Sequence, residues 1–164
     1  MSEIVLRPAM PDDLELLWEF LAMAAYEPNA AAVKTVPMAT TFLDGWQRPT
    51  DFGFIAERDG QAIGAAWARQ FASREESWFW FDDRTPEISV GVREHARGQG
   101  VGQMLIGALI AEATSRGLRL CLNVRDTNPA RRLYERMGFK VVPDRTVTNR
   151  VGGRSYGMLW GEPS

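Results

Sequence analysis

The stretch that decides the fold is Glu87-Ile88-Ser89-Val90-Gly91-Val92, which leads after four residues into Arg97-Gly98-Gln99-Gly100-Val101-Gly102. The first segment has the pattern of a strand, and the second is a glycine-rich loop. After the loop, apolar side chains at steps of three and four predict a helix; they are Val101, Leu105, Ile106, Leu109, Ile110 and Ala113. Unpaired N–H groups gather at such a helix start, at the positive end of the helix dipole. The stretch therefore predicts a phosphate-binding site.

The composition limits the classes of protein to which the chain can belong. Its 164 residues suffice for one domain with a core, so we expect a single domain over residues 1–164. The 45% hydrophobic content is that of a globular protein, no run approaches the roughly 18 apolar residues of a membrane helix, and Met1–Arg7 is not a targeting peptide. A net charge of −2 and a pI near 5.5 argue against a nucleic-acid partner. Cys121 is the only cysteine, which excludes a disulfide framework or a thiolate metal cluster. We expect a cytoplasmic protein with no metal.

Strand and helix signals alternate along the chain and predict an α/β domain with helices packed on a mixed sheet. An Asp59-Gly60 turn predicts a hairpin, and Pro11 predicts the start of a first helix. The expected strands cover residues 4–6, 52–57, 62–67, 87–92, 118–124, 139–142 and 156–160. The expected helices continue from Pro11, from Val101 and over residues 130–137, with a short one near residues 38–46. Residues 73–86 are either a strand extension or a surface loop.

Three kinds of phosphate loop compete for residues 97–102. A nucleotide P-loop needs Lys and then Ser or Thr after its last glycine, whereas Gln103 and Met104 follow here. A dinucleotide fingerprint needs G-x-G-x-x-G, and Gln103 or Leu105 stands where its last glycine belongs. The loop does fill a third pattern: Arg or Gln, two residues, Gly, one residue, then Gly or Ala.

In that third pattern the chain resembles the GNAT N-acetyltransferase superfamily, whose members bind the pyrophosphate of acetyl-CoA on this loop. About 25 residues further on, Asn128-Pro129-Ala130-Arg131-Arg132-Leu133-Tyr134-Glu135-Arg136-Met137-Gly138-Phe139 resembles the second acetyl-CoA segment of the family. The likeness extends to Arg7-Pro8 and to the strand order, so it covers nearly the whole chain. It implies a GNAT-like fold: a mostly antiparallel twisted sheet with flanking helices, whose central strands at residues 87–92 and 118–124 splay apart to open a cleft.

The same resemblance implies a set of residues that hold acetyl-CoA. The pantetheine arm would pair with the backbone at Val90 and Val92. The pyrophosphate would rest on the loop, which supplies Arg97, Gly98, Gln99, Gly100, Val101 and Gly102. Asn123 is either a contact to pantetheine or substrate or a structural amide, and Asn128 is a helix cap and cofactor contact. Arg131 and Arg132 either meet the 3′-phosphate or are solvated helix charges.

Acyl transfer to an amine also requires acid–base groups. A lysine-like amine has a pKa of about 10.4 and arrives protonated, so a base must take its proton. The family resemblance implies Glu87 in that role; the alternative is a solvated strand-end carboxylate, and Asp82 and Asp83 are lesser candidates. Tyr134 occupies the position of the family's acid for the departing thiolate; the alternative is a core residue with a satisfied hydroxyl. The N–H of Val92 would polarise the thioester carbonyl.

The sequence leaves alternatives for the reaction, the acceptor and the role of one aromatic run. We expect an N-acetyltransferase that moves acetyl directly from acetyl-CoA to a primary amine of a small molecule or peptide. The alternatives are a non-catalytic acyl-CoA sensor on the same fold, another acyl donor or a hydroxyl acceptor. The run Trp78-Phe79-Trp80-Phe81 either walls an acceptor pocket or, as we favour, packs partly on the sheet and partly in a homodimer interface. His95 is expected in a solvent-side loop, and the acceptor is not indicated by any motif.

Overall fold

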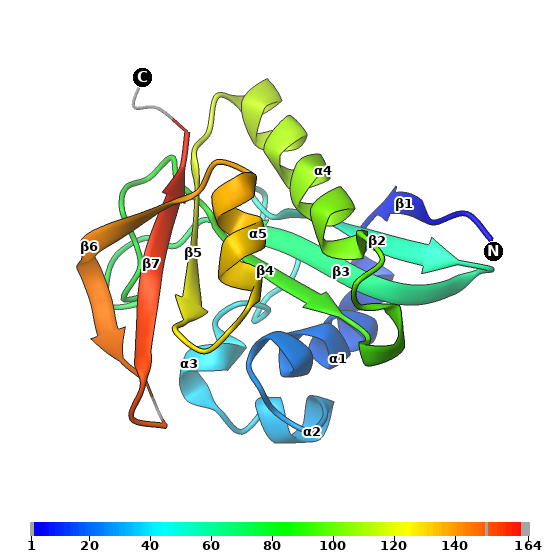
Figure 1. The fold of residues 1–164 in the computed structure, drawn as a ribbon, viewed down its shortest axis with the longest axis horizontal. Coiled ribbons are helices and arrows are strands. Elements are labelled where there is room, and N and C mark those ends of the chain that lie inside the picture. Colours follow the sequence, from blue (N-terminus) through cyan, green and yellow to red (C-terminus); the bar gives the residue numbers. More distant parts are fainter. Residues whose placement is uncertain (1, 150, 162–164) are drawn as a thin grey trace. The chain divides into compact units, whose positions relative to one another are not determined.

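The structure is a computed structural model that describes residues 2–149 and 151–161. Within these residues the strands form a seven-stranded sheet in the order β1-β2-β3-β4-β5-β7-β6 (Figure 1). The strands are β1 (Val5–Pro8), β2 (Phe52–Arg58), β3 (Gln61–Arg69), β4 (Glu87–Val92), β5 (Leu120–Arg125), β6 (Lys140–Thr148) and β7 (Arg154–Trp160). Four recorded pairings are antiparallel and β4 with β5 is parallel. The predicted mixed, mostly antiparallel sheet is confirmed.

Residue contacts divide the chain into two compact units. The first unit comprises Met1–Arg69 and Ser89–Ala111, and the second comprises Gln70–Ile88 and Glu112–Ser164. Strand β4 and helix α4 (Val101–Arg116) each contribute residues to both units. The expected single domain over residues 1–164 stays a prediction, and Met1 and residues 162–164 lie outside the described residues.

The predicted hairpin is present in the first unit. Asp59 and Gly60 have φ values of 54° and 76°, the left-handed pair that a two-residue type I′ turn requires. The strands that it joins pair antiparallel from Phe52 opposite Ala68 to Arg58 opposite Gln61. The Asp59-Gly60 turn, which was predicted from the sequence, therefore sets the pairing of β2 with β3.

The two faces of β3 carry different helices of the first unit. Ala65 and Trp67 lie in a buried cluster with Leu17 and Phe20 of α1 (Leu14–Ala24), which follows a 3₁₀ turn at Pro11–Asp13. Gly64 points the other way, because side chains alternate along a strand. A Cβ built on Gly64 would lie 2.8 Å from Val101 and 3.1 Å from Leu105 of α4. The predicted helices after Pro11 and from Val101 are confirmed, and a glycine at 64 lets α4 approach closely.

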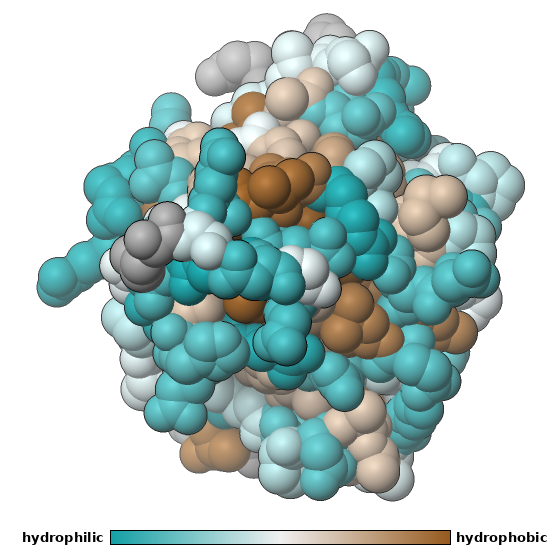
Figure 2. Space-filling model, turned by 90° about the vertical axis from the view of Figure 1, so that its right-hand side faces the viewer, coloured by the Kyte–Doolittle hydropathy of each residue, from teal (hydrophilic) through white to brown (hydrophobic). Residues whose placement is uncertain are grey.

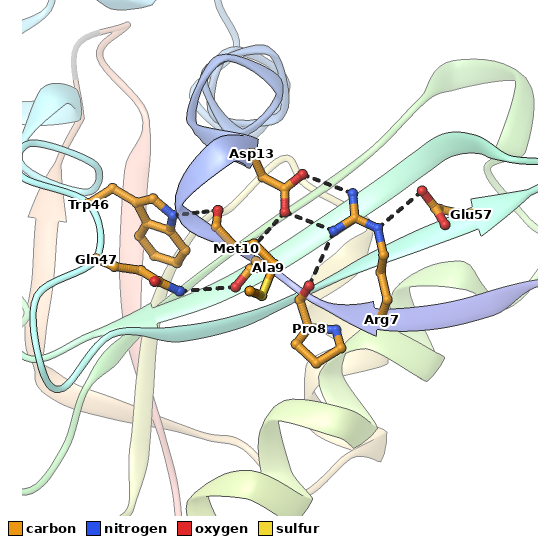
Figure 3. A network of polar contacts seen from close by, with 8 residues as sticks. All are labelled: Arg7, Pro8, Ala9, Met10, Asp13, Trp46, Gln47 and Glu57. Atoms are coloured by element: carbon orange, nitrogen blue, oxygen red, sulfur yellow. Dashed lines mark hydrogen bonds and ion pairs between the residues drawn. The ribbon is translucent and has the colours of Figure 1, made fainter.

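Arg7 fixes the passage from β1 into the first helix (Figure 3). Its guanidinium donates to both carboxylate oxygens of Asp13 at 2.8 Å and to Glu57 of β2 at 3.1 Å. The bond from Arg7 is the main reason that the pKa of Asp13 lies below its ordinary value. In the same view, the side chains of Trp46 and Gln47 donate to the carbonyls of Met10 and Ala9.

Residues 26–50 correct one prediction. In place of one helix near residues 38–46 there are two short ones, α2 (Ala30–Val33) and α3 (Pro37–Thr40). The hydroxyls of Thr40 and Thr41 donate to the carbonyls of Pro37 and Met38, so they compete for helical acceptors. Gly45 then has φ of 69°, which turns the chain away from a helix.

The segment after α3 is anchored by a buried ion pair. Arg69, the last residue of β3, and Asp51, just before β2, both have fully buried side chains and lie 2.7 Å apart. The guanidinium also donates to the carbonyls of Thr41 and Asp44. Each buried charge thus has several partners, which is the condition for burying an ion pair without a large penalty.

In the second unit, helix α5 (Ala130–Arg136) ends as predicted. Gly138 has φ of 103°, and the Phe139 N–H donates to Tyr134 O at 3.0 Å. Strand β6 is longer than expected and runs to Thr148. The register of the pairing with β7 shifts between Val142 and Thr146, and this irregularity accommodates Pro143, so the strand continues beyond its expected end at residue 142. Of the helices in the described residues, none is long and apolar enough to cross a membrane.

Removing the carboxylate of Asp51 should strongly destabilise the protein. In Asp51→Ala the Arg69 guanidinium stays buried without its counter-charge, and we expect the free energy of unfolding to fall by about 4 kcal/mol in urea titrations. The control is Glu112→Ala, which removes a partly exposed pair with Arg116 and should cost less than about 1 kcal/mol. Equal losses in the two variants would contradict the role of the buried pair.

Candidate active site

The predicted phosphate loop has the backbone that an anion cradle needs. Gly98 and Gly100 have φ of 75° and 83°, and a Cβ built on either residue would meet nothing within 4 Å. The first hydrogen bond into α4 runs from the Met104 N–H to Gly100 O, 3.1 Å. The N–H groups before it have no intrahelical acceptor, so they are available to an anion at the open side of the loop.

A clasp that sequence reasoning missed holds this loop. The Gln99 side chain accepts from Arg58 Nη2 at 2.6 Å and donates to His95 O at 3.1 Å. Arg58 ends β2, 41 residues before Gln99, and no motif links the two. Arg97 is exposed and its Nε lies 3.4 Å from Val92 O. Two guanidinium groups therefore accompany the loop, where only Arg97 was expected, and the exposed position expected for His95 is confirmed.

Strand β4 approaches α1 very closely in the first unit. A Cβ on Gly91 would lie 2.5 Å from Phe20 O, so only glycine fits at this position. Val90 and Val92, the residues expected to pair with pantetheine, flank it and are half-buried. The close contact at Gly91 thus fixes the position of the part of β4 that is expected to pair with pantetheine.

Glu87, the candidate base, is buried rather than solvated. The residue is 1% exposed, and it lies opposite Cys121 where β4 begins. Its Oε1 accepts from the Ser77 hydroxyl at 2.5 Å and its Oε2 accepts from Asn123 Nδ2 at 2.8 Å. The alternative of a solvated strand-end carboxylate is wrong.

Burial dominates the proton affinity of this carboxyl. Desolvation raises the pKa of Glu87 to about 7, although the hydrogen bonds from Ser77 and Asn123 act to lower it. A carboxyl with this pKa changes its protonation near neutral pH, as a general base does. Asn123, expected as a contact to pantetheine or substrate or as a structural amide, donates its amide N–H to Glu87. Ser77 is a partner of Glu87 that the sequence did not indicate.

Asp82 is occupied by other partners. Its carboxylate accepts from the Thr85 hydroxyl at 2.6 Å and from the Arg84 N–H at 2.8 Å, and it pairs with the Arg119 guanidinium. Burial acts to raise its pKa, but these hydrogen bonds outweigh it and hold the pKa below the ordinary value. Asp82 therefore anchors the segment before β4 and is a poor base.

Tyr134, the candidate acid, lies on α5 and is half-buried, with its ring edge-on to that of Phe139 at 6.1 Å between centroids.

Asn128 accepts the Ala130 N–H at 2.9 Å, so its expected capping role is present. Arg131 donates to Glu135 at 2.9 Å and stacks on the ring of Tyr156 at 4.7 Å. A hollow of about 530 Å³ is lined by Asp126, Thr127, Asn128, Pro129, Arg131, Arg132 and Glu135. Arg131 and Arg132 thus differ in their surroundings: Arg131 has side-chain partners, whereas Arg132 is exposed.

The aromatic run before β4 is split between interior and surface. Trp78 is 61% exposed, whereas Phe79 is 8% exposed and its ring would lie 2.9 Å from a Cβ on Gly157. Figure 2 shows one side of the molecule, where apolar residues form small separate patches among polar ones. The homodimer interface stays a prediction. The predicted burial of Cys121 is confirmed, at 0% exposure.

The sequence matches the family model for the acetyltransferase (GNAT) family over residues 15–139. The chain belongs to the GNAT acetyltransferase family. It is 28% identical over 139 residues to the 5-NmdU N-acetyltransferase of Pseudomonas phage PaMx11, covering 84% of this chain and 88% of the relative. It is 39% identical over 97 residues to the mycothiol acetyltransferase of Thermobispora bispora, covering 57% of this chain but only 31% of that protein.

Solved GNAT structures share the fold. A Salmonella typhimurium protein described as an acetyltransferase, solved with its cofactor acetyl-CoA, has a TM-score of 0.74 at 23% identity, covering 99% of this chain and 97% of that one. A ribosomal-protein-alanine N-acetyltransferase from Brucella melitensis has a TM-score of 0.69 at 24% identity, covering 94% and 98%. The GNAT-like fold implied by the two sequence motifs is confirmed.

The buried carboxyl of Glu87 should make stability depend on pH. Its pKa is raised from 4.5 to about 7 in the folded chain. Between these values the folded state holds a proton that the unfolded state releases, so the free energy of unfolding falls as the pH rises. We expect about 3 kcal/mol to be lost between pH 5 and pH 8, measured by urea titration at each pH.

Glu87→Gln cannot titrate and should lose most of this dependence. Glu75→Gln is the matched control, because Glu75 is exposed in the segment before β4, and it should keep the wild-type curve. A wild-type stability that stays flat from pH 5 to pH 8 would show that Glu87 titrates normally.

Proposed function

We propose that this protein is an acetyl-CoA-dependent N-acetyltransferase that transfers acetyl directly to a primary amine, within one domain over residues 1–164. The observation that carries the proposal is Glu87, a buried carboxylate with two hydrogen-bond donors and a pKa of about 7. Such a group accepts a proton near neutral pH, which an amine nucleophile requires. The N-acetyltransferase activity named for the phage relative supports an amine as acceptor.

The loop at residues 97–102 fits the diphosphate of the donor. Gly98 and Gly100 leave its open side free of side-chain carbons, and Arg58 and Arg97 add positive charge. The chemistry that acetyl-CoA supplies is an activated thioester. The amides of residues 99–102 would bind its pyrophosphate, and the backbone of Val90 and Val92 would hold its pantetheine.

Glu87 and Tyr134 take the two proton-transfer roles. Glu87 would receive the proton of the acceptor amine, directly or through water, because an ammonium has no lone pair for attack. The Tyr134 hydroxyl would donate to the sulfur as the thiolate of CoA departs, since that sulfur gains negative charge. Asn128 would add a contact near the start of α5, with Arg131 and Arg132 as candidates for the 3′-phosphate.

Gly100→Ala should weaken CoA binding. The added Cβ strains a residue at φ of 83° and enters the open side of the loop, so we expect the Kd for CoA to rise at least tenfold in calorimetry. Gly60→Ala is the matched control: Gly60 has φ of 76° and open space around it, but lies in the hairpin turn. It should lose a similar stability, about 1 kcal/mol, and keep the wild-type Kd. Equal Kd values for the two variants would contradict the proposed role of the loop in binding the diphosphate of CoA.

Turnover should appear in a free-thiol assay with acetyl-CoA and a panel of amino acids, polyamines, aminoglycosides and peptide N-termini. With the acceptor so found, Tyr134→Phe should lower kcat about 100-fold and change the Kd for CoA less than threefold, because the hydroxyl acts on the departing sulfur. Glu87→Gln should remove the acidic limb of the pH–rate profile near pH 7.

The control for the tyrosine is Tyr156→Phe, which removes a hydroxyl from β7 and should leave kcat within threefold of wild type. An unchanged kcat in Tyr134→Phe would reject that residue as the acid. CoA binding without thiol release for every acceptor would favour a non-catalytic acyl-CoA sensor over a transferase.

A further inference from the structure

We infer that Ser77 is a positioning residue of the active site: its hydroxyl holds the Glu87 carboxylate in its ionised, proton-accepting form. The inference rests on the proposed role of Glu87 as base. It adds a residue that neither motif of the sequence contains, from the segment before β4 that has no regular secondary structure.

Ser77 is fixed in place by its own backbone. Its N–H donates to Ser73 O at 3.2 Å, and its carbonyl accepts from the Trp80 N–H at 3.1 Å. The residue is 5% exposed, so its hydroxyl meets a protein partner rather than bulk water. The segment thus presents one buried hydroxyl to Glu87 from a hydrogen-bonded turn.

The hydrogen-bond pattern defines where the hydroxyl proton goes. Ser77 Oγ accepts from the Phe79 N–H at 3.3 Å, and it donates to Glu87 Oε1 at 2.5 Å. A hydroxyl has only one proton to donate, and here that proton points at the carboxylate. The other carboxylate oxygen faces the amide nitrogen of Asn123, which is also a donor. Both neighbours therefore favour a charged Glu87 against the cost of burying it.

The other groups around Glu87 do not supply this stabilisation. Cys121, its partner on β5, is fully buried, and burial is the main reason that its pKa lies well above the ordinary value, so the thiol stays neutral. Asp82, Arg119 and Arg145 act electrostatically on Cys121, and Asp82 and Arg119 pair with each other. Within the described residues Glu87 has no ion-pair partner, so its charge depends on hydrogen bonds.

The test is a titration of the Glu87 carboxyl by carbon NMR on the full chain without substrate, with its signal assigned by its absence in Glu87→Gln. Ser77→Ala should raise the midpoint by about one pH unit, a tenfold higher proton affinity, because the charged form loses a donor. Ser77→Thr keeps the hydroxyl and should restore the wild-type midpoint within about 0.3 unit. Ser77→Cys fills the site with a weak donor and should raise the midpoint like alanine, which covers a failure of Ser77→Ala to fold.

Ser73→Ala is the matched control, because Ser73 lies in the same segment and its hydroxyl accepts from the Glu75 N–H instead. An unchanged midpoint in Ser77→Ala and Ser77→Cys, or the same rise in Ser73→Ala, overturns the inference. The acidic limb of the pH–rate profile should move with the NMR midpoint. If the midpoint moves and the rate profile does not, Ser77 does act on Glu87 and the proposal that Glu87 is the base fails.

Discussion

The constraint on which the proposed active site depends is a carboxylate held away from water at the first residue of β4, Glu87. A buried charge is tolerated only when donors replace the water it has lost. Here the donors are one hydroxyl and one amide, and no cation in the described part of the chain pairs with this carboxylate. At Asp82 burial also acts to raise the pKa, but hydrogen bonds from the Thr85 hydroxyl, the Arg84 N–H and the Arg119 guanidinium outweigh it and hold that pKa below the ordinary value. Two acidic residues five positions apart thus differ in proton affinity, because burial dominates at Glu87 and hydrogen bonds dominate at Asp82.

The loop that begins ten residues further along the chain, at Arg97, has the opposite task in the proposed site, where it would hold a negatively charged group at the surface. It offers backbone N–H groups together with the guanidinium groups of Arg58 and Arg97. The clasp of Gln99 by Arg58 fixes the loop to the end of β2. An anion cradle whose donors are already oriented spends less entropy when it binds than a flexible loop would.

Local patterns explain which parts of the fold were predictable. The hairpin turn at Asp59-Gly60, the loop at residues 97–102 and the apolar face of α4 each depend on residues close in sequence, and all three were found. Two family motifs then indicated the GNAT fold. The helices at residues 30–40 were not found correctly, because Thr hydroxyls and a buried arginine from β3 decide their ends. The continuation of β6 beyond residue 142 was not predicted either, because it depends on an irregular pairing with β7.

The candidate site was predictable only as far as its motifs extend. Glu87 was identified from its place before the loop, but its burial was not, because the segment that covers it lacks a regular pattern. Ser77 bonds a residue ten positions away, and Arg58 bonds one 41 positions away. Such pairs follow from packing, and a single sequence carries no signal of them. The segments proposed to bind acetyl-CoA therefore stand out as sequence motifs, whereas the proton affinity of Glu87, the proposed base, depends on its burial and on side chains outside those motifs.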